Sequence, residues 1–239
     1  KSINMKNKLT ALLKNTCLMV SLIIVTGTVQ ATCVDNVVLV HGNTGSPSDW
    51  DNTYDLLIAN GYTSSQIYRP SWGSSYAANN NHNGSEETPV KNDINTALST
   101  SCTGKIDVIA HSMGVTLAAQ QIIKLNKSSQ VDAFVGVAGA YRGLWTCGVY
   151  PWNVWTSTCG YYGLSVSSPF LGWLDDTVIA NRIYSIKSWD DQIVCGSGVC
   201  TVGGVHSSHI PNENASYTYA LDHFGLQTDT ASQQVDLIE

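Results

Sequence analysis

A serine at the junction of an apolar run and a helix-length segment is the first feature that suggests chemistry. Residues 106–110 (IDVIA) have the composition of a buried strand, and residues 113–125 have that of a helix. Between them, Ser112 is flanked by the small residues Ala110 and Gly114. Strand, tight turn and helix in this order form a nucleophile elbow, which lifts the serine hydroxyl out at the edge of the sheet. We therefore expect Ser112 to be a nucleophile. The alternative, an ordinary serine at a helix start, is disfavoured by this context.

Two backbone N–H groups are candidates for stabilising an oxyanion beside that serine. The N–H of Met113 lies at the start of the helix, where it is free to face an anion. The second donor is expected in the loop after the first central strand. Residues 37–40 (VVLV) run directly into His41 and Gly42, so a sharp turn at the glycine would aim the N–H of Asn43 at the same point. His41 could also be a base, but we assign it a structural role because a base is expected further along the chain.

A serine hydroxyl becomes a good nucleophile only when a base takes its proton and a carboxylate orients that base. In this kind of fold the acid follows the serine and the histidine comes last. Asp190 and Asp191 both lie just beyond a predicted strand at residues 182–186, and the residue pattern does not choose between them. Asp175 and Asp176 are further acidic candidates after the serine.

Three histidines follow these acids and could serve as the base. His206 and His209 lie in a stretch rich in Gly and Ser, which is typical of a loop or a substrate edge. His223 lies shortly before a helix that we predict over residues 230–238. This position favours His223 as the base.

The elements that must position these residues alternate along the chain. Short β-branched runs predict strands, and amphipathic segments between them predict helices. The strands are predicted at residues 37–40, 66–69, 106–110, 133–137 and 182–186, and the helices at 49–60, 86–100, 113–125 and 230–238. Such alternation predicts an α/β fold, with a mostly parallel central sheet and helices on both faces.

Residues 141–174 interrupt this alternation. They contain many aromatic residues among Gly and Ser, including Trp145, Trp152 and Trp155, and show no helical or strand periodicity. A long irregular insertion of this kind is usually functional, so we interpret it as a lid or a substrate-binding wall that uses these three tryptophans. The alternative is a satellite hydrophobic cluster held by a disulfide.

Composition limits the class of protein. The chain has 239 residues, of which 43% are apolar and 13% charged, and its formal net charge is −6. One domain is the default for such a length. Nucleic-acid binding is not expected, because it requires a cationic surface. We expect a monomer that needs no cofactor and no metal ion.

The N-terminal residues have the pattern of an export signal. Lys6, Lys8 and Lys14 precede an apolar stretch at residues 17–29, and small side chains at Val29 and Ala31 suit a cleavage site. A membrane anchor is the alternative, but the apolar stretch is short for a bilayer. We therefore predict that residues 1–31 are removed and that residues 32–239 form one secreted domain.

The cysteines agree with export. Once Cys17 is removed with the signal, an even number remains, which favours disulfides in an oxidising compartment. Proximity in the chain predicts the pairs Cys147–Cys159 and Cys195–Cys200, and elimination leaves Cys33–Cys102. Free buried thiols are the alternative. The spacing of Cys and His does not resemble that of a zinc site.

These motifs together resemble a known group of enzymes. The sequence is similar to the small secreted bacterial lipases of the α/β-hydrolase superfamily, and more closely to the lipase-like extracellular polyhydroxyalkanoate depolymerases. The matching segments are residues 41–43 (HGN), 109–115 (IAHSMGV), 130–132 (QVD), 138–144 (AGAYRGL), 191–195 (DQIVC) and 223–228 (HFGLQT). The chain is shorter than the depolymerases, and its disulfides and aromatic insertion distinguish it from the smallest lipases.

The resemblance implies an assignment for each site residue. In both groups the acid precedes a short apolar pair, which implies Asp191 rather than Asp190 as the acid. It also implies His223 as the base and the N–H groups of Asn43 and Met113 as the oxyanion hole. We expect a lipase or short-chain esterase, with a polyester depolymerase second and an inactive binding module as the alternative of another class.

Overall fold

The computed structural model describes residues 33–239, which lie within one compact unit of the chain. The predicted signal segment at residues 1–31 lies outside the described residues, so its cleavage stays a prediction. Among the helices of residues 33–239, none has the length and apolar character that crossing a bilayer requires.

A six-stranded sheet forms the centre of the molecule. All neighbouring strands are parallel, in the order β10-β7-β4-β3-β1-β2. The strands are β1 (Asn36–Val40), β2 (Ile67–Tyr68), β3 (Ile106–His111), β4 (Val131–Val137), β7 (Arg182–Lys187) and β10 (Ala215–Thr218). The five predicted strands are confirmed, although β2 has only two residues. The sequence pattern missed β10, because this edge strand carries no continuous apolar run.

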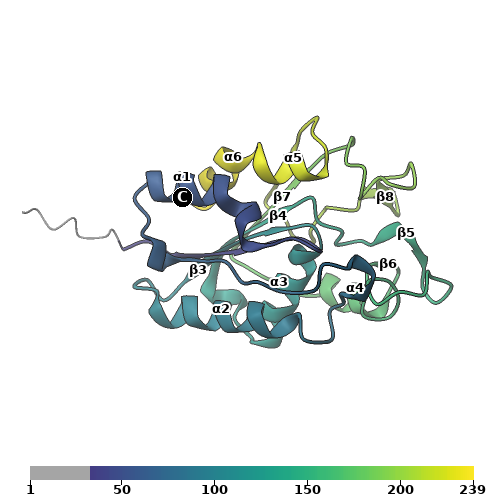
Figure 1. The fold of residues 1–239 in the computed structure, drawn as a ribbon, viewed down its shortest axis with the longest axis horizontal. Helices are drawn as coiled ribbons and strands as arrows, with labels where there is room; N and C mark the ends of the chain where they lie inside the picture. The colour runs from purple at the N-terminus through teal and green to yellow at the C-terminus, as the bar shows by residue number, and fades with distance from the viewer. Residues whose placement is uncertain (1–32) are drawn as a thin grey trace, which may run out of the picture. The chain divides into compact units, whose positions relative to one another are not determined.

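Helices cover both faces of the sheet, as predicted (Figure 1). On one face lie α1 (Asp51–Ala59), α5 (His223–Thr228) and α6 (Ala231–Asp236), and on the other lie α2 (Glu87–Thr100), α3 (Met113–Lys124) and α4 (Pro169–Asp175). Single turns of 3-10 helix lie at Pro47–Trp50, Ser64–Gln66, Ala77–Asn79 and Ser128–Gln130. The predicted closing helix at residues 230–238 is confirmed as α6, and an additional short helix, α5, begins at His223 itself.

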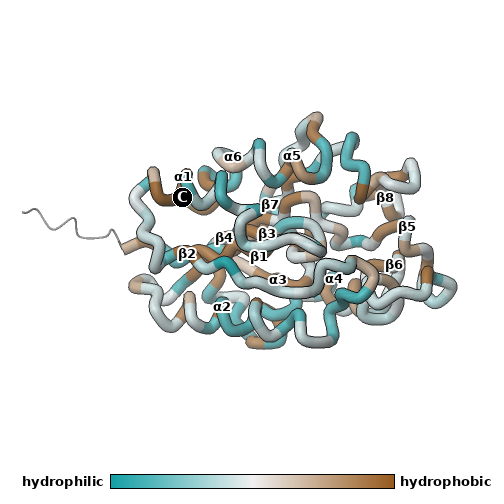
Figure 2. The backbone as a smooth tube through the Cα atoms, viewed as in Figure 1, coloured by the Kyte–Doolittle hydropathy of each residue, from teal (hydrophilic) through white to brown (hydrophobic). Residues whose placement is uncertain are grey.

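The apolar strands pack against both helical layers. Side chains alternate between the two faces of a strand, so Val38 and Val40 join one apolar cluster while Val37 and Leu39 join the other. All four of these side chains are fully buried, which explains why residues 37–40 are continuously apolar. Figure 2 shows much of the apolar colour along the central strands, with polar residues spread over the surrounding helices and loops.

The aromatic insertion is more regular than the sequence indicated. Besides α4, it contains the parallel pair β5 (Leu144–Val149) and β6 (Ser165–Val166). The expectation of an irregular segment was therefore wrong for residues 144–149, 165–166 and 169–174, whereas turns and loops make up most of the rest. The strands were missed because β5 contains only one aromatic residue and β6 has only two residues. Buried His82 anchors the insertion: its Nδ1 lies 2.9 Å from the Tyr162 carbonyl oxygen and its ring stacks on Phe170 at 4.2 Å. A small antiparallel hairpin, β8 (Thr201–Val202) and β9 (Val205–His206), follows the loop after β7.

All three predicted disulfides are confirmed. Cys33–Cys102 ties the start of β1 to the segment between α2 and β3, Cys147–Cys159 closes the loop after β5, and Cys195–Cys200 closes the loop after β7. Disulfides persist in oxidising compartments, so these bonds indicate a protein that functions outside the cytosol.

Candidate active site

Ser112 occupies a strained turn between β3 and α3. Its φ of 54° and ψ of −129° are unusual for a residue with a side chain. The turn is held because the Ser112 N–H donates to the Val137 carbonyl at 2.9 Å. It also needs a glycine at position 114, where a Cβ would lie 2.2 Å from the His41 carbonyl oxygen. These features match the elbow expected from the sequence.

Ser112, His223 and Asp191 form a continuous chain of hydrogen-bonding distances. His223 Nε2 lies 2.9 Å from Ser112 Oγ, and His223 Nδ1 lies 2.8 and 2.9 Å from the two carboxylate oxygens of Asp191. His223 is 3% exposed and Asp191 fully buried, whereas Ser112 is partly exposed. The arrangement leaves the serine hydroxyl as the member that a substrate can reach.

The loop after β7 brings Asp191 rather than Asp190 to the histidine. Asp190 is exposed, and its N–H donates to Ser188 Oγ at 2.9 Å. The Asp191 carboxylate also accepts the N–H groups of Ile193 and Val194 at 2.9 and 2.8 Å. Burial by itself would raise the pKa of Asp191, but the hydrogen bond and charge of His223, together with these N–H groups, outweigh it and lower the pKa. A carboxylate is thus maintained beside His223.

Asn43 lines the pocket in front of Ser112, and Met113 directly follows Ser112 as the first residue of α3. The N–H of Met113 lies in the first turn of α3, where it has no partner within the helix. Neither N–H takes part in the backbone hydrogen bonds of the turns, loops and caps of residues 33–239. The loop after β1 can approach Ser112 closely only because residue 42 is a glycine. A Cβ there would lie 2.9 Å from Ser112 Cβ and 2.8 Å from His111 Nδ1. The Asn43 side chain is itself fixed, since Asn80 Nδ2 donates to its Oδ1 at 2.6 Å.

The pocket around Ser112 has a volume of about 470 Å³. Its lining combines the loop after β1, Ser112 and His223, and residues of α5, and consists of Gly42, Asn43, Thr44, Gly45, Asp49, Ala77, His111, Ser112, Ile193, His223, Phe224, Gln227 and Thr228. Ile193 and Phe224 are exposed apolar residues at its rim.

The three tryptophans predicted to bind substrate do not line this pocket. Trp145 Nε1 donates to the Thr201 carbonyl at 2.8 Å, which fixes the ring against the β8 hairpin. Trp152 and Trp155 are 86% and 94% exposed, and Trp155 lines a separate groove with Tyr76 and Tyr150. The insertion therefore presents aromatic rings to solvent beside the site, not to Ser112.

The other candidate histidines have structural surroundings. His41 is buried and stacks on Trp72, with Nδ1 2.8 Å from the Gly42 carbonyl oxygen and Nε2 accepting the Trp72 N–H at 3.2 Å. This agrees with the loop-ordering role expected for it. His206 is buried, with Nε2 3.1 Å from the Ser188 carbonyl oxygen. His209 pairs with Glu213 at 2.8 Å.

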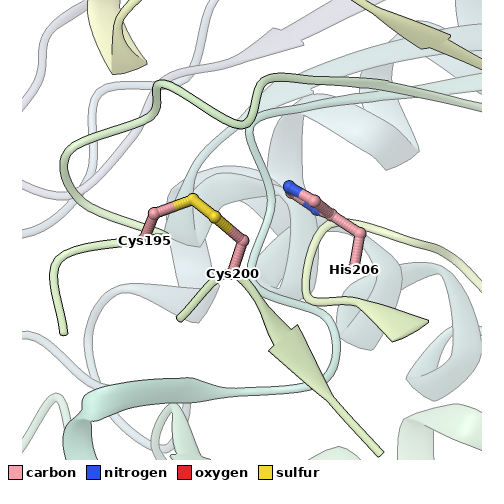
Figure 3. A group of neighbouring side chains, drawn as sticks. All are labelled: Cys195, Cys200 and His206. Atoms are coloured by element: carbon pink, nitrogen blue, oxygen red, sulfur yellow. A yellow bond between two sulfur atoms is a disulfide. The ribbon is translucent and has the colours of Figure 1, made fainter. Parts of the chain in front are cut away.

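Two groups of side chains in the described part have metal-ligand proximity, but their chemistry does not favour a metal site. Cys195, Cys200 and His206 lie together, yet the two sulfurs are bonded to each other, as Figure 3 shows, and are not available as thiolate ligands. The second group comprises Asp35, Asp107 and Asp132. Asp132 in this group is already paired with Lys105 and Arg182, which neutralise it.

Sequence reasoning missed several residues at the site. His111 and Gln192 contact the main chain of His223, and Ala77, Ile193 and Phe224 line the pocket. His111 and Gln192 are each adjacent in sequence to a predicted triad member, and this adjacency was the available signal. No signal marked Ala77, which reaches the pocket from a distant 3-10 turn.

Comparison with known proteins gives both a family and a fold. The model of the family described as lipase (class 2) matches residues 35–236. None of the curated protein sequences matches the chain significantly.

Among solved structures, the mature lipase BlEst2 of Bacillus licheniformis superposes with a TM-score of 0.64 at 15% identity, over 87% of this chain and 93% of that one. Lipase B of Aspergillus fumigatus gives 0.55 at 16% identity, over 83% of this chain and 52% of that one. An extracellular α/β-hydrolase from a Paenibacillus species gives 0.52 at 13% identity, over 85% and 98%. At these identities the likeness establishes the fold, which is that of the α/β-hydrolases. Because the family model spans nearly all of the described residues, the chain belongs to the class 2 lipases and is a serine ester hydrolase.

Proposed function

We propose that Ser112, His223 and Asp191 hydrolyse carboxylic esters through an acyl-enzyme. The observation that carries this proposal is the chain of contacts at 2.8–2.9 Å from Ser112 Oγ through His223 to Asp191. Ser112 Oγ attacks the ester carbonyl carbon while His223 Nε2 takes its proton. His223 then returns the proton to the leaving alkoxide. Water repeats the attack on the acyl-enzyme, with the same histidine as base, and releases the acid.

Asp191 and two N–H groups would stabilise the charges that develop. Asp191 fixes the tautomer of His223 with its proton on Nδ1 and stabilises the imidazolium. The N–H groups of Asn43 and Met113 would hold the tetrahedral oxyanion, and each such donor is typically worth about 2.7–4 kcal/mol of barrier. The reaction as written requires no cofactor.

The substrate class follows from the rim of the pocket. Ile193 and Phe224 are 40% and 59% exposed beside Ser112, so an acyl chain could bury them. We infer that the natural substrates are lipid or other apolar esters, such as triacylglycerols or short-chain esters.

A decisive test compares Ser112→Ala with the matched surface variant Ser232→Ala on p-nitrophenyl butyrate. We expect kcat of Ser112→Ala to fall by about 10⁶, with an unchanged melting temperature, and Ser232→Ala to keep the wild-type rate. A fluorophosphonate probe should label the wild type and not Ser112→Ala. Wild-type turnover by Ser112→Ala would refute the triad, and an unlabelled wild type would favour an inactive binding module.

A second candidate function is extracellular polyester depolymerisation. The observation that favours it is the exposed aromatic surface of Trp152 and Trp155, together with a groove of about 780 Å³ beside residues 76–79. Ala77 of this same segment borders the pocket of Ser112. Exposed aromatic rings could adsorb to a solid polymer, because large apolar patches usually mark interaction surfaces.

Turnover on polyhydroxybutyrate film, tributyrin emulsion and soluble butyrate ester separates the two functions. For a depolymerase, the double variant Trp152→Ser/Trp155→Ser should lower the ratio of film to soluble turnover at least about tenfold, and Leu56→Ser on α1 should leave that ratio unchanged. The factor assumes the loss of two aromatic contacts of about 1 kcal/mol each. A wild type with no film turnover would contradict this second function and leave the esterase function standing.

We further propose that the protein is an exported monomer. The three disulfides support export. Light scattering of the purified protein would test the monomeric state.

A further inference from the structure

Two side chains form hydrogen bonds to the main chain of His223, one to its N–H and one to its carbonyl group. Each belongs to a residue that is adjacent in sequence to one of the other two triad members. The N–H of His223 donates to Gln192 Oε1 at 2.9 Å, and Gln192 directly follows Asp191. Its carbonyl oxygen lies 3.0 Å from His111 Nε2, and His111 directly precedes Ser112. Residues 111 and 112 therefore both contact His223, one at its backbone and the other at its ring.

His111 is enclosed between His223 and the oxyanion loop. It is 2% exposed, and its ring centre lies 4.7 Å from that of His223. Its Nδ1 lies against Gly42, because a Cβ on that glycine would be 2.8 Å away. His111 thus contacts the two parts of the site that must be placed relative to Ser112.

The chemistry of this contact fixes the protonation of His111. A carbonyl oxygen only accepts, so Nε2 must carry the hydrogen and donate it. Burial, followed by the nearby charge of His223, lowers the pKa of His111 to about 3. His111 therefore remains a neutral donor when His223 becomes an imidazolium, and it does not compete for the proton of Ser112.

We propose that His111 is a positioning residue that holds the base, His223, through its carbonyl group. Asp191 fixes the far edge of the imidazole, but the position of the ring relative to Ser112 Oγ also depends on where the main chain of His223 lies. The hydrogen bond from His111 sets that position from the residue adjacent to the nucleophile. A misplacement of about 1 Å can cost a factor of about 10² in rate. This inference rests on the triad proposed above.

The test uses variants of His111 that differ in the position of their hydrogen-bond donor. The amide nitrogen of Gln in His111→Gln can take the place of Nε2, whereas that of Asn in His111→Asn reaches only the place of Nδ1. We expect kcat for p-nitrophenyl butyrate to stay within about threefold in His111→Gln, and to fall about 10- to 100-fold in His111→Asn and His111→Leu. KM should change less than about twofold, because this contact positions the base and does not bind the ester.

His209→Gln is the matched control, since it removes a histidine paired with Glu213 away from the pocket and should leave kcat unchanged. Titration of active sites with a fluorophosphonate normalises kcat to folded enzyme, and the rate of labelling should fall in parallel with kcat. If His111→Leu fails to fold, the kcat values of His111→Gln and His111→Asn still test the inference. Equal kcat values for these two variants would overturn the inference. If the variant Ser112→Ala keeps the activity of the wild type, the proposed triad itself is overturned.

Discussion

At the scale of single residues, Asp191 shows how a buried charge is maintained beside a histidine. Its carboxylate is fully buried, yet it receives hydrogen bonds from His223 and from two backbone N–H groups. An unpaired carboxylate at this position would be strongly disfavoured. The same contacts that keep its pKa low also fix the direction in which it faces His223.

Replacing Asp191 by Asn keeps the shape of the side chain but removes its charge and its control of the His223 tautomer. We expect kcat of Asp191→Asn to fall about 10⁴-fold, because the amide favours the wrong tautomer of His223. Asp190→Asn, one residue away and exposed, should stay within about twofold of the wild type. Steady-state kinetics on p-nitrophenyl butyrate provide the measurement. A comparable loss in both variants would contradict the assignment of Asp191.

At the scale of elements, the pairing of β3 with β4 contains an irregularity that a buried acid occupies. The register shifts between Ile106 and Val108, and there the Ala133 N–H donates to Asp107 Oδ1 at 2.9 Å. Asp107 is 1% exposed. Burial, and secondly the charge of Asp35, raises its pKa to about 8. The carboxyl group thus completes the strand pairing while it holds a proton.

This raised pKa makes stability depend on pH in a definite direction. In the unfolded chain Asp107 ionises near its ordinary pKa of 3.8, and in the folded protein near 8. Between about pH 4 and 8 the folded state therefore binds more protons, so the free energy of unfolding falls as pH rises. Asp107→Asn keeps the acceptor without the charge, and its melting temperature should exceed that of the wild type increasingly from pH 5 to pH 8.

The difference should reach at least about 2–4 °C, which corresponds to about 1 kcal/mol for a chain of this size. Thermal melts followed by circular dichroism at both pH values measure it. Asp55→Asn, an exposed acid on α1, is the control and should show no such trend. A constant difference between wild type and Asp107→Asn across this range would contradict the raised pKa.

At the scale of the whole molecule, the disulfides act over very different lengths of chain. Cys33–Cys102 joins residues separated by 69 positions, and Cys195–Cys200 joins residues separated by 5. In the chain-entropy model a longer closed loop restricts the unfolded chain more, which corresponds to about 4 kcal/mol for the first and about 2 kcal/mol for the second. The shorter loop, however, begins directly after Ile193 and Val194, whose N–H groups hold the Asp191 carboxylate. The N–H of Cys195 itself donates to the Asp191 carbonyl oxygen at 2.9 Å.

Removing each of these two disulfides should therefore affect stability and activity to different degrees. Cys33→Ala/Cys102→Ala should lower the free energy of unfolding by about 4 kcal/mol and leave kcat of the folded fraction unchanged. Cys195→Ala/Cys200→Ala should cost about half as much stability but lower kcat. Urea unfolding and kinetics per titrated active site give the two quantities. A greater loss of kcat in the first variant than in the second would contradict this division.

Much of the fold was predictable because its local patterns are strong. Short β-branched runs predicted five of the six parallel strands, and helix-length segments predicted α1, α2, α3 and α6 but not α4 or α5. The edge strand β10 and the small strands of the insertion were not predictable, because exposed or two-residue strands carry little hydrophobic signal. Proximity in the chain sufficed for two of the disulfides, and elimination for the third.

For the site, the sequence by itself determined the elbow of Ser112, because small flanking residues and a strand-to-helix junction are local features. It left Asp190 and Asp191 undecided until a resemblance favoured one of them, and it directed attention to tryptophans that lie away from Ser112. Only the tertiary structure brought Asp191 and His223 together and placed His111 against the carbonyl of His223. These contacts join residues that are 32 and 112 positions apart. The folding of the whole sheet, not any local pattern, sets such distances.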